Sequence, residues 1–204
     1  YPETTGYIIP TLFALADRLG RPELVERAVR ASEGLLRIQH TDGGWQGGRV
    51  GEERPSVVFN TAQIIRGMLA THARTGDARY LEAAARAGDW IVAVQEADGS
   101  WKRKNFMGEA RVYDSYVDAP LLMLHAVTGK EVLRQAAQRN LAWAVTRQQA
   151  NGWFSDADNT IKHNDRPIVH TIAYTIDGLA ESGALLADTR WTEHAHRAAR
   201  PLRD

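Results

Sequence analysis

The sequence has 204 residues, of which 44% are hydrophobic, so the chain can bury a sizeable core. It carries 25 Lys and Arg against 25 Asp and Glu, a balance that excludes a global field attracting nucleic acid or an anionic membrane. Cysteine is absent, which excludes disulfides, thiolate metal sites and a cysteine nucleophile. We therefore expect a soluble protein without nucleic-acid or membrane partners, with the cytoplasm as the favoured compartment. The oligomeric state stays open.

A short motif recurs three times along the chain. Its copies are Gln39-His-Thr-Asp-Gly-Gly-Trp45, Gln95-Glu-Ala-Asp-Gly-Ser-Trp101 and Gln148-Gln-Ala-Asn-Gly-Trp-Phe154. The first residues of successive copies are 56 and 53 positions apart, and a glycine stands 19 positions before each, at Gly20, Gly76 and Gly129. Two landmarks that recur together predict a tandem structural repeat.

Each repeat predicts an inner and an outer helix. The stretch before the glycine is strongly apolar, as in residues 6–16 and 119–127, which is typical of a buried helix. The stretch after it is amphipathic, as in residues 80–95, which is typical of an outer helix. A fourth repeat begins near His170 and ends with residues 191–200, without the closing Gln and Trp. We predict an all-α fold of about eight helices with negligible strand content.

The four repeats predict one domain of four helical hairpins, at about 1–45, 59–101, 112–154 and 170–204. The Asp-Gly and Asn-Gly pairs that begin at positions 42, 98 and 151 predict helix exits, because glycine accepts a left-handed conformation. The connections 46–58, 102–112 and 155–169 then share one end of the assembly with the inner-helix N-termini. Repeat proteins usually place function on such loops.

Residues 88–101, Gly88-Asp-Trp-Ile-Val-Ala-Val-Gln95-Glu-Ala-Asp-Gly99-Ser-Trp101, resemble the QW repeat of squalene cyclases and the prenyltransferase α/α-toroid superfamily; residues 33–45 are a looser copy. The resemblance implies a partial or complete α/α toroid, in which the glutamine caps a neighbouring helix and the tryptophan stacks beside it. The cyclases' Asp-x-Asp-Asp cluster is absent, as is the zinc-ligating cysteine of protein prenyltransferases. The same architecture houses six-hairpin glycosidases such as unsaturated glucuronyl hydrolases, together with sugar epimerases and uronate lyases. Four hairpins therefore imply a fragment of a larger toroid or an open ring.

Aligning the repeats places polar or aromatic residues at one position of every inner helix, namely Tyr7, Gln63, Tyr116 and Tyr174. About one turn earlier stand further polar residues, namely Glu3, Asn60, Tyr113, Asp114 and His170. Together they predict a polar ring at the inner-helix starts. The alternative is that these groups satisfy the helix N-termini and one another.

Asp114 and Asp118 are four residues apart and so share a helix face, where paired carboxylates could supply a general acid. A solvated pair favoured by the helix dipole is the alternative interpretation. Asp177 interrupts an apolar stretch and aligns with Arg66 of the second repeat. The structural alternative to a catalytic role for Asp177 is an ion pair with Arg66.

His170 and Tyr174 are also four residues apart, and a histidine base beside a tyrosine acid suits β-elimination of uronates. Asn60, with Arg66 or Arg111, could neutralise the substrate carboxylate. A capping histidine and a core tyrosine explain the same residues structurally. The aromatic residues that close the repeats, Trp45, Trp101 and Trp153, either stack on sugar rings or pack in the core.

The leading hypothesis is a carbohydrate-active enzyme, a glycoside hydrolase or polysaccharide lyase that acts on an acidic oligo- or polysaccharide. The alternatives are a non-catalytic glycan- or peptide-binding module and a terpenoid-handling toroid.

The candidate catalytic residues are Asp114, Asp118, His170, Tyr174 and Asp177. The candidate substrate-binding residues are Glu3, Tyr7, Asn60, Gln63, Arg66, Arg111, Tyr113, Tyr116 and Trp101. No metal or cofactor is expected, since His194 and His196 lie on different sides of a helix and no metal-binding motif occurs. Asn60, Asp114, His170 and Tyr174 are predicted to converge around a solvent-reachable pocket.

Overall fold

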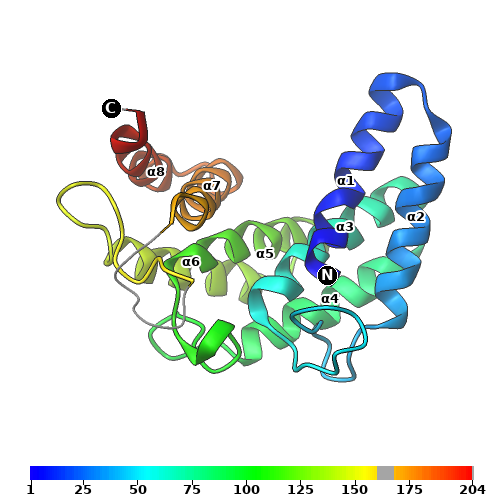
Figure 1. Cartoon of the computed structure of the whole chain (residues 1–204), viewed down its shortest axis with the longest axis horizontal. Helices are drawn as coiled ribbons and strands as arrows, with labels where there is room; N and C mark the ends of the chain where they lie inside the picture. The colour runs from blue at the N-terminus through cyan, green and yellow to red at the C-terminus, as the bar shows by residue number, and fades with distance from the viewer. Residues whose placement is uncertain (160–167, 204) are drawn as a thin grey trace. The chain divides into compact units, whose positions relative to one another are not determined.

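The computed structural model describes residues 1–159 and 168–203, and these residues form a helical chain (Figure 1). Its α-helices are α1 (Pro2–Leu19), α2 (Pro22–Arg37), α3 (Val58–Thr75), α4 (Ala78–Ala93), α5 (Ser115–Thr128), α6 (Glu131–Val145), α7 (Val169–Leu186) and α8 (Thr189–Arg203). Two short 3-10 turns, η1 (Phe106–Gly108) and η2 (Val112–Asp114), precede α5. Over the described residues, β-structure is limited to two isolated bridges, Gln46 with Ser56 and Gln148 with Phe154. The prediction of eight helices with negligible strand content is confirmed.

The chain forms two compact units, residues 1–93 and 94–204, each of which contains two hairpins. In the first unit, α1 pairs with α2, α3 pairs with α4, and the two inner helices α1 and α3 pack together. The second unit repeats this pattern, with α5 paired to α6, α7 paired to α8, and α5 packed on α7. The grouping of all four hairpins into one domain stays a prediction.

Three inner helices end at the glycines that the repeat predicts. Gly20, Gly76 and Gly129 are left-handed, with φ of 64°, 71° and 68°, and each donates its N–H to the carbonyl four residues earlier. Glycine adopts this left-handed conformation at the lowest energy, because in any other residue the Cβ would crowd the following carbonyl. In α7 the same role falls to Ala187, with φ of 51°.

Neighbouring inner helices approach to backbone contact at a glycine. A Cβ on Gly6 of α1 would lie 2.6 Å from the carbonyl oxygen of Gln63 in α3. A Cβ on Gly178 of α7 would lie 2.3 Å from the carbonyl carbon of Ser115 in α5. No side chain fits either place, so the glycines allow the start of α1 to lie against α3 and the start of α5 to lie against α7.

Each of the three motif copies forms the same joint, a pair of hydrogen bonds made by its glutamine. In each, the glutamine Nε2 donates to a carbonyl of its own turn and to a carbonyl of the next outer helix. The acceptor oxygens are those of Gly43 and Ala83 for Gln39, Gly99 and Ala136 for Gln95, and Gly152 and His194 for Gln148, at 2.8–3.0 Å. The acceptors on the next helix lie within it, in α4, α6 and α8, so the glutamine does not cap that helix as the resemblance implied.

The Asp-Gly and Asn-Gly pairs lie in tight turns that follow the outer helices, and not at the helix C-termini themselves. The outer helices end earlier, at Arg37, Ala93 and Val145, and the glycines at 43, 99 and 152 lie in the following turn with φ of 92–96°. The preceding Asp or Asn uses its Oδ1 to accept the N–H two residues on, which forms an Asx turn. The turn, rather than the helix, is what needs the glycine.

The closing aromatic residues are buried. Trp45 and Trp101 are 0% exposed, and Phe154, the last residue of the third copy, is 2% exposed. Trp45 also donates its indole N–H to the Leu35 carbonyl at 2.8 Å. Neither of these two tryptophans has a ring face open to a sugar, which favours packing as their role.

Candidate functional site

The predicted site residues are divided between the two units. The first unit holds Glu3, Tyr7, Asn60, Gln63 and Arg66, and the second holds Trp101, Arg111, Tyr113, Asp114, Tyr116, Asp118, His170, Tyr174 and Asp177. The convergence of Asn60 on the residues of the second unit therefore stays a prediction, as does the ion pair between Arg66 and Asp177. Asp177 itself is exposed on α7.

In the first unit, the polar residues lie at the starts of α1 and α3. Gln63 has no exposed surface, and its Oε1 accepts a hydrogen bond from Arg66 Nε at 3.0 Å. Glu3 Oε2 is buried and has no hydrogen-bond partner among the described residues, while Asn60 is half-buried. The Gln63 contact therefore fits the alternative in which these polar side chains satisfy one another's hydrogen bonds.

In the second unit, aromatic rings gather at the starts of α5 and α7. The Tyr116 and Tyr174 rings stack with centroids 5.2 Å apart and an interplanar angle of 20°. His170 meets the edge of Tyr174 at 5.0 Å and 82°. His170 is exposed and both tyrosines are half-buried, so the cluster has an open side. The close approach at Gly178, together with a hydrogen bond from Ser115 Oγ to the Thr175 carbonyl (3.3 Å), holds these helix starts together.

Two carboxyl groups are completely buried beside this helix start. Asp114 and Asp118 are each 0% exposed, so the solvated-pair interpretation is wrong. Asp114 Oδ2 accepts a hydrogen bond from Asn105 Nδ2. Asp114 Oδ1 and both Asp118 oxygens have no hydrogen-bond partner among the described residues. The α5 start therefore holds two carboxyl groups whose hydrogen-bonding capacity is mostly unused.

Burial governs the acidity of these groups. It raises the pKa of Asp114 well above its ordinary value, against the opposing effects of the Asn105 hydrogen bond and the Arg111 charge. Burial also raises the pKa of Asp118, and the negative charge of Asp114 raises it further. Burial likewise raises the pKa of Tyr113. Proton retention by a carboxyl group is the property that a general acid needs near neutral pH.

Arg111 is buried and hydrogen-bonds within the protein. It is 2% exposed, and its Nη1 donates to the backbone carbonyl of Asp158, which is 1% exposed. The next residue, Val112, donates its N–H to the Asp156 carbonyl at 2.9 Å. Arg111 thus ties the connection after α6 to the start of α5 and places a positive charge near Asp114. Its predicted role in neutralising a substrate carboxylate stays a prediction.

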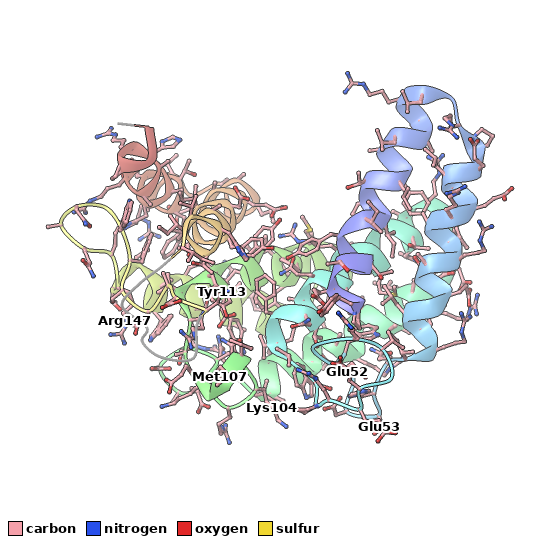
Figure 2. The ribbon with its side chains drawn as sticks, viewed as in Figure 1. Glu52, Glu53, Lys104, Met107, Tyr113 and Arg147 are labelled. Atoms are coloured by element: carbon pink, nitrogen blue, oxygen red, sulfur yellow. The ribbon has the colours of Figure 1, made fainter. Side chains whose placement is uncertain are left out.

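Asn105 was not among the predicted site residues. It is 7% exposed and lies on the loop that Lys104 and Met107 mark in Figure 2. It stands nine residues before Asp114 in an irregular segment, where no periodicity relates the two positions. Only the fold reveals their contact.

We predict that Asp118→Leu stabilises the protein by about 1–3 kcal/mol at neutral pH, because it removes a buried carboxyl group that lacks partners. The pKa of Asp118 is raised in the folded state. Its favourable contribution to the free energy of unfolding is therefore complete below the pKa of an unfolded aspartate, about 3.9. This contribution is lost as the pH rises through the pKa that Asp118 has in the folded protein. The advantage of the variant should therefore grow with pH. Urea unfolding at several pH values measures it, and a destabilised variant at neutral pH would contradict the prediction.

Two kinds of feature are absent from the part of the chain that the structure describes. No group of three His, Cys, Asp or Glu side chains is placed to hold a metal ion. No described helix combines the length and apolar character needed to cross a membrane.

Comparisons with known proteins identify the fold and the family. Among solved structures, the unsaturated glucuronyl hydrolase of Bacillus sp. GL1, responsible for glycosaminoglycan degradation, is similar, with a TM-score of 0.78 and 17% identity over 99% of this chain and 62% of that one. An unsaturated glucuronyl hydrolase specific for heparin has a TM-score of 0.78 and 11% identity over the same shares. A GH76 α-mannanase of Bacteroides thetaiotaomicron has a TM-score of 0.73 and 17% identity over 97% of this chain and 56% of that one.

The chain thus spans about three fifths of the length of these solved structures. Their likeness confirms the predicted fold class, tandem helical hairpins of the α/α-toroid type. No curated protein sequence matches this one. The pattern of the squalene-hopene cyclase C-terminal domain matches residues 3–180, which is most of the chain. The chain therefore belongs to the squalene-hopene cyclase C-terminal domain family.

Proposed function

We propose that this chain acts as a carbohydrate-active enzyme that cleaves an acidic oligo- or polysaccharide by hydrolysis. The observation that carries the proposal is the buried pair of Asp114 and Asp118, whose surroundings favour a proton-bearing carboxyl group. The similar solved structures include two unsaturated glucuronyl hydrolases and an α-mannanase, which supports cleavage of a glycan.

The proposed chemistry assigns a role to each group of the second unit. One carboxyl group of the pair gives its proton to the glycosidic oxygen, and the bond from that oxygen to the anomeric carbon breaks. The oxygen of a water molecule bonds to the anomeric carbon, and the proton that this water loses returns to the carboxyl pair. The half-buried Tyr116 and Tyr174 rings offer a surface for a sugar ring beside the exposed His170. Because both carboxyl groups are 0% exposed, substrate binding must open a path to the pair.

Elimination is the second chemistry that the same cluster supports. His170 is exposed and touches the edge of the Tyr174 ring, as a base and an acid acting on one uronate would need. In this case His170 removes the proton next to the substrate carboxylate and Tyr174 protonates the departing oxygen. Hydrolysis is favoured because the buried carboxyl pair has no part in elimination.

Two further functions are each favoured by one observation. Complete burial of Asp114 and Asp118 favours a glycan-binding module without catalysis. The family match favours a terpenoid-handling pocket. The sequence lacks the cyclases' Asp-x-Asp-Asp cluster, which places this function third.

A substrate panel separates these functions. Purified protein is incubated with unsaturated glycosaminoglycan disaccharides, polygalacturonate, alginate and mannan, and both reducing ends and the ultraviolet absorbance of the conjugated uronate double bond are followed. We expect reducing ends from an acidic glycan without a rise in absorbance. A rise would indicate a lyase, and cleavage of mannan alone would contradict the acidic substrate. Binding without cleavage would support the module, and saturable binding of a squalene analogue alone would support the terpenoid pocket.

A further inference from the structure

Asn105 is held by hydrogen bonds at both ends of its amide. Its Oδ1 accepts the backbone N–H of Phe106 at 2.8 Å, so its Nδ2 must face the other way. Nδ2 lies 3.3 Å from the Trp101 carbonyl oxygen and donates to Asp114 Oδ2. The amide cannot turn its oxygen toward Asp114 without giving up the bond to Phe106. Asp114 therefore faces a fixed hydrogen-bond donor.

Asp118 has no equivalent donor. Both of its oxygens are buried without a hydrogen-bond partner among the described residues. An ionised carboxylate in such a place costs several kcal/mol, and the group takes up a proton instead. Asp114 differs because it has the Asn105 donor and, from Arg111, both a backbone hydrogen bond and a nearby positive charge. The two neighbouring carboxyl groups are thus chemically unequal.

We propose that Asn105 is a positioning residue that makes Asp114 the carboxylate of the pair and leaves the proton on Asp118. The assignment deepens the proposed hydrolysis and rests on it for its catalytic meaning, because it names which carboxyl group of the pair holds the proton. Asn105 acts through Asp114 and has no assigned contact with substrate.

The other charged groups around the pair are accounted for in the described part of the second unit. Near Asp114 lie Arg111 and Tyr113, and Asp158 lies near Tyr113. On α7, which packs against α5 and η2, His170 and Asp177 are exposed and Glu181 is half-buried.

The remaining neighbour of α5 is α6, whose charged side chains are engaged elsewhere. Its Glu131 and Arg134 pair with each other at 2.6 Å, and Arg139 donates to Gln95 Oε1. Among the described residues, Asn105 is thus the side chain whose hydrogen bond distinguishes Asp114 from Asp118.

The test follows the carbon-13 signals of the aspartate carboxyl groups during a pH titration, with Asp114→Asn and Asp118→Asn used to assign them. In the wild type, Asp114 should lose its proton at lower pH than Asp118. Asn105→Leu, which keeps the side-chain size but removes the amide, should raise the proton affinity of Asp114 by roughly tenfold and narrow the gap to Asp118. Asn140→Leu is the matched control, because Asn140 is a fully buried asparagine of α6 that donates to the Gly99 carbonyl at 3.1 Å. It should leave both titrations unchanged.

A second variant tests the inference should Asn105→Leu fail to fold. Asp118→Asn should leave the titration of Asp114 in place if Asp118 already holds the proton. A shift of Asp114 to lower pH would show that Asp118 was the anion and would overturn the assignment, as would an unchanged titration in folded Asn105→Leu.

The titration needs no substrate, so it separates this inference from the proposed function. Unequal titration without glycan cleavage would retain the positioning role and reject the hydrolase. With an active substrate, Asn105→Leu should also move the acid limb of the kcat/KM profile to higher pH, a change that a purely structural role would not produce.

Discussion

Asp114→Asn should lower kcat for glycan cleavage by roughly 10²- to 10⁴-fold, because an amide can neither release nor accept the proton that the reaction needs. His170→Ala should give a loss at the lower end of this range, because His170 lies on the open side of the Tyr116 and Tyr174 cluster. Steady-state kinetics on the substrate found in the panel measures both effects.

The stability of the two variants must be measured beside their kinetics. A substitution that empties no hydrophobic core should leave thermal melting nearly unchanged. The exposure of His170 supports this for His170→Ala, whereas Asp114 is fully buried near Arg111. Asp17→Asn is a suitable control, since its partner Arg74 lies on the surface and such pairs contribute little. Equal losses of melting temperature in both site variants, with kcat intact, would favour a structural role.

Trp45→Ala should destabilise the protein by about 3–5 kcal/mol, since it empties the space of a fully buried indole and removes its hydrogen bond to the Leu35 carbonyl. Trp45→Phe keeps an aromatic ring but loses the N–H donor, so a smaller loss is expected. Chemical denaturation of the three proteins measures the difference.

Leu19→Ala supplies the control for this series. Leu19 is 57% exposed on α1, and its truncation should change the free energy of unfolding by less than about 0.5 kcal/mol. A loss for Trp45→Ala no larger than that of Leu19→Ala would contradict the packing role of the repeat aromatic.

The fold could be predicted because its signals are local and repeated. Gly20, Gly76 and Gly129 each end an inner helix through their own backbone conformation, which no distant contact has to supply. The turns after the outer helices were harder to separate from the helix ends, because the preference of glycine for positive φ serves both a helix end and a separate turn, as at Gly43. Sequence alone does not distinguish these two uses.

The candidate site was predicted less completely. Four-residue spacing was enough to bring His170 to Tyr174, because residues four apart on a helix are neighbours. The same spacing could not say whether Asp114 and Asp118 face water, since that depends on what packs over α5. The contact with Asn105 depends on the path of an irregular loop, which no periodic pattern encodes.

The joint between outer helices has a consequence for how such chains can change in length. Each glutamine recognises only main-chain carbonyls, those of Ala83, Ala136 and His194, and each turn glycine lies against the backbone of the same neighbouring helix. A backbone looks much the same in any α-helix, so the joint places few demands on the identity of the residues that receive it. A whole hairpin could therefore be duplicated, lost or exchanged by recombination within the gene while the junctions on either side remain compatible.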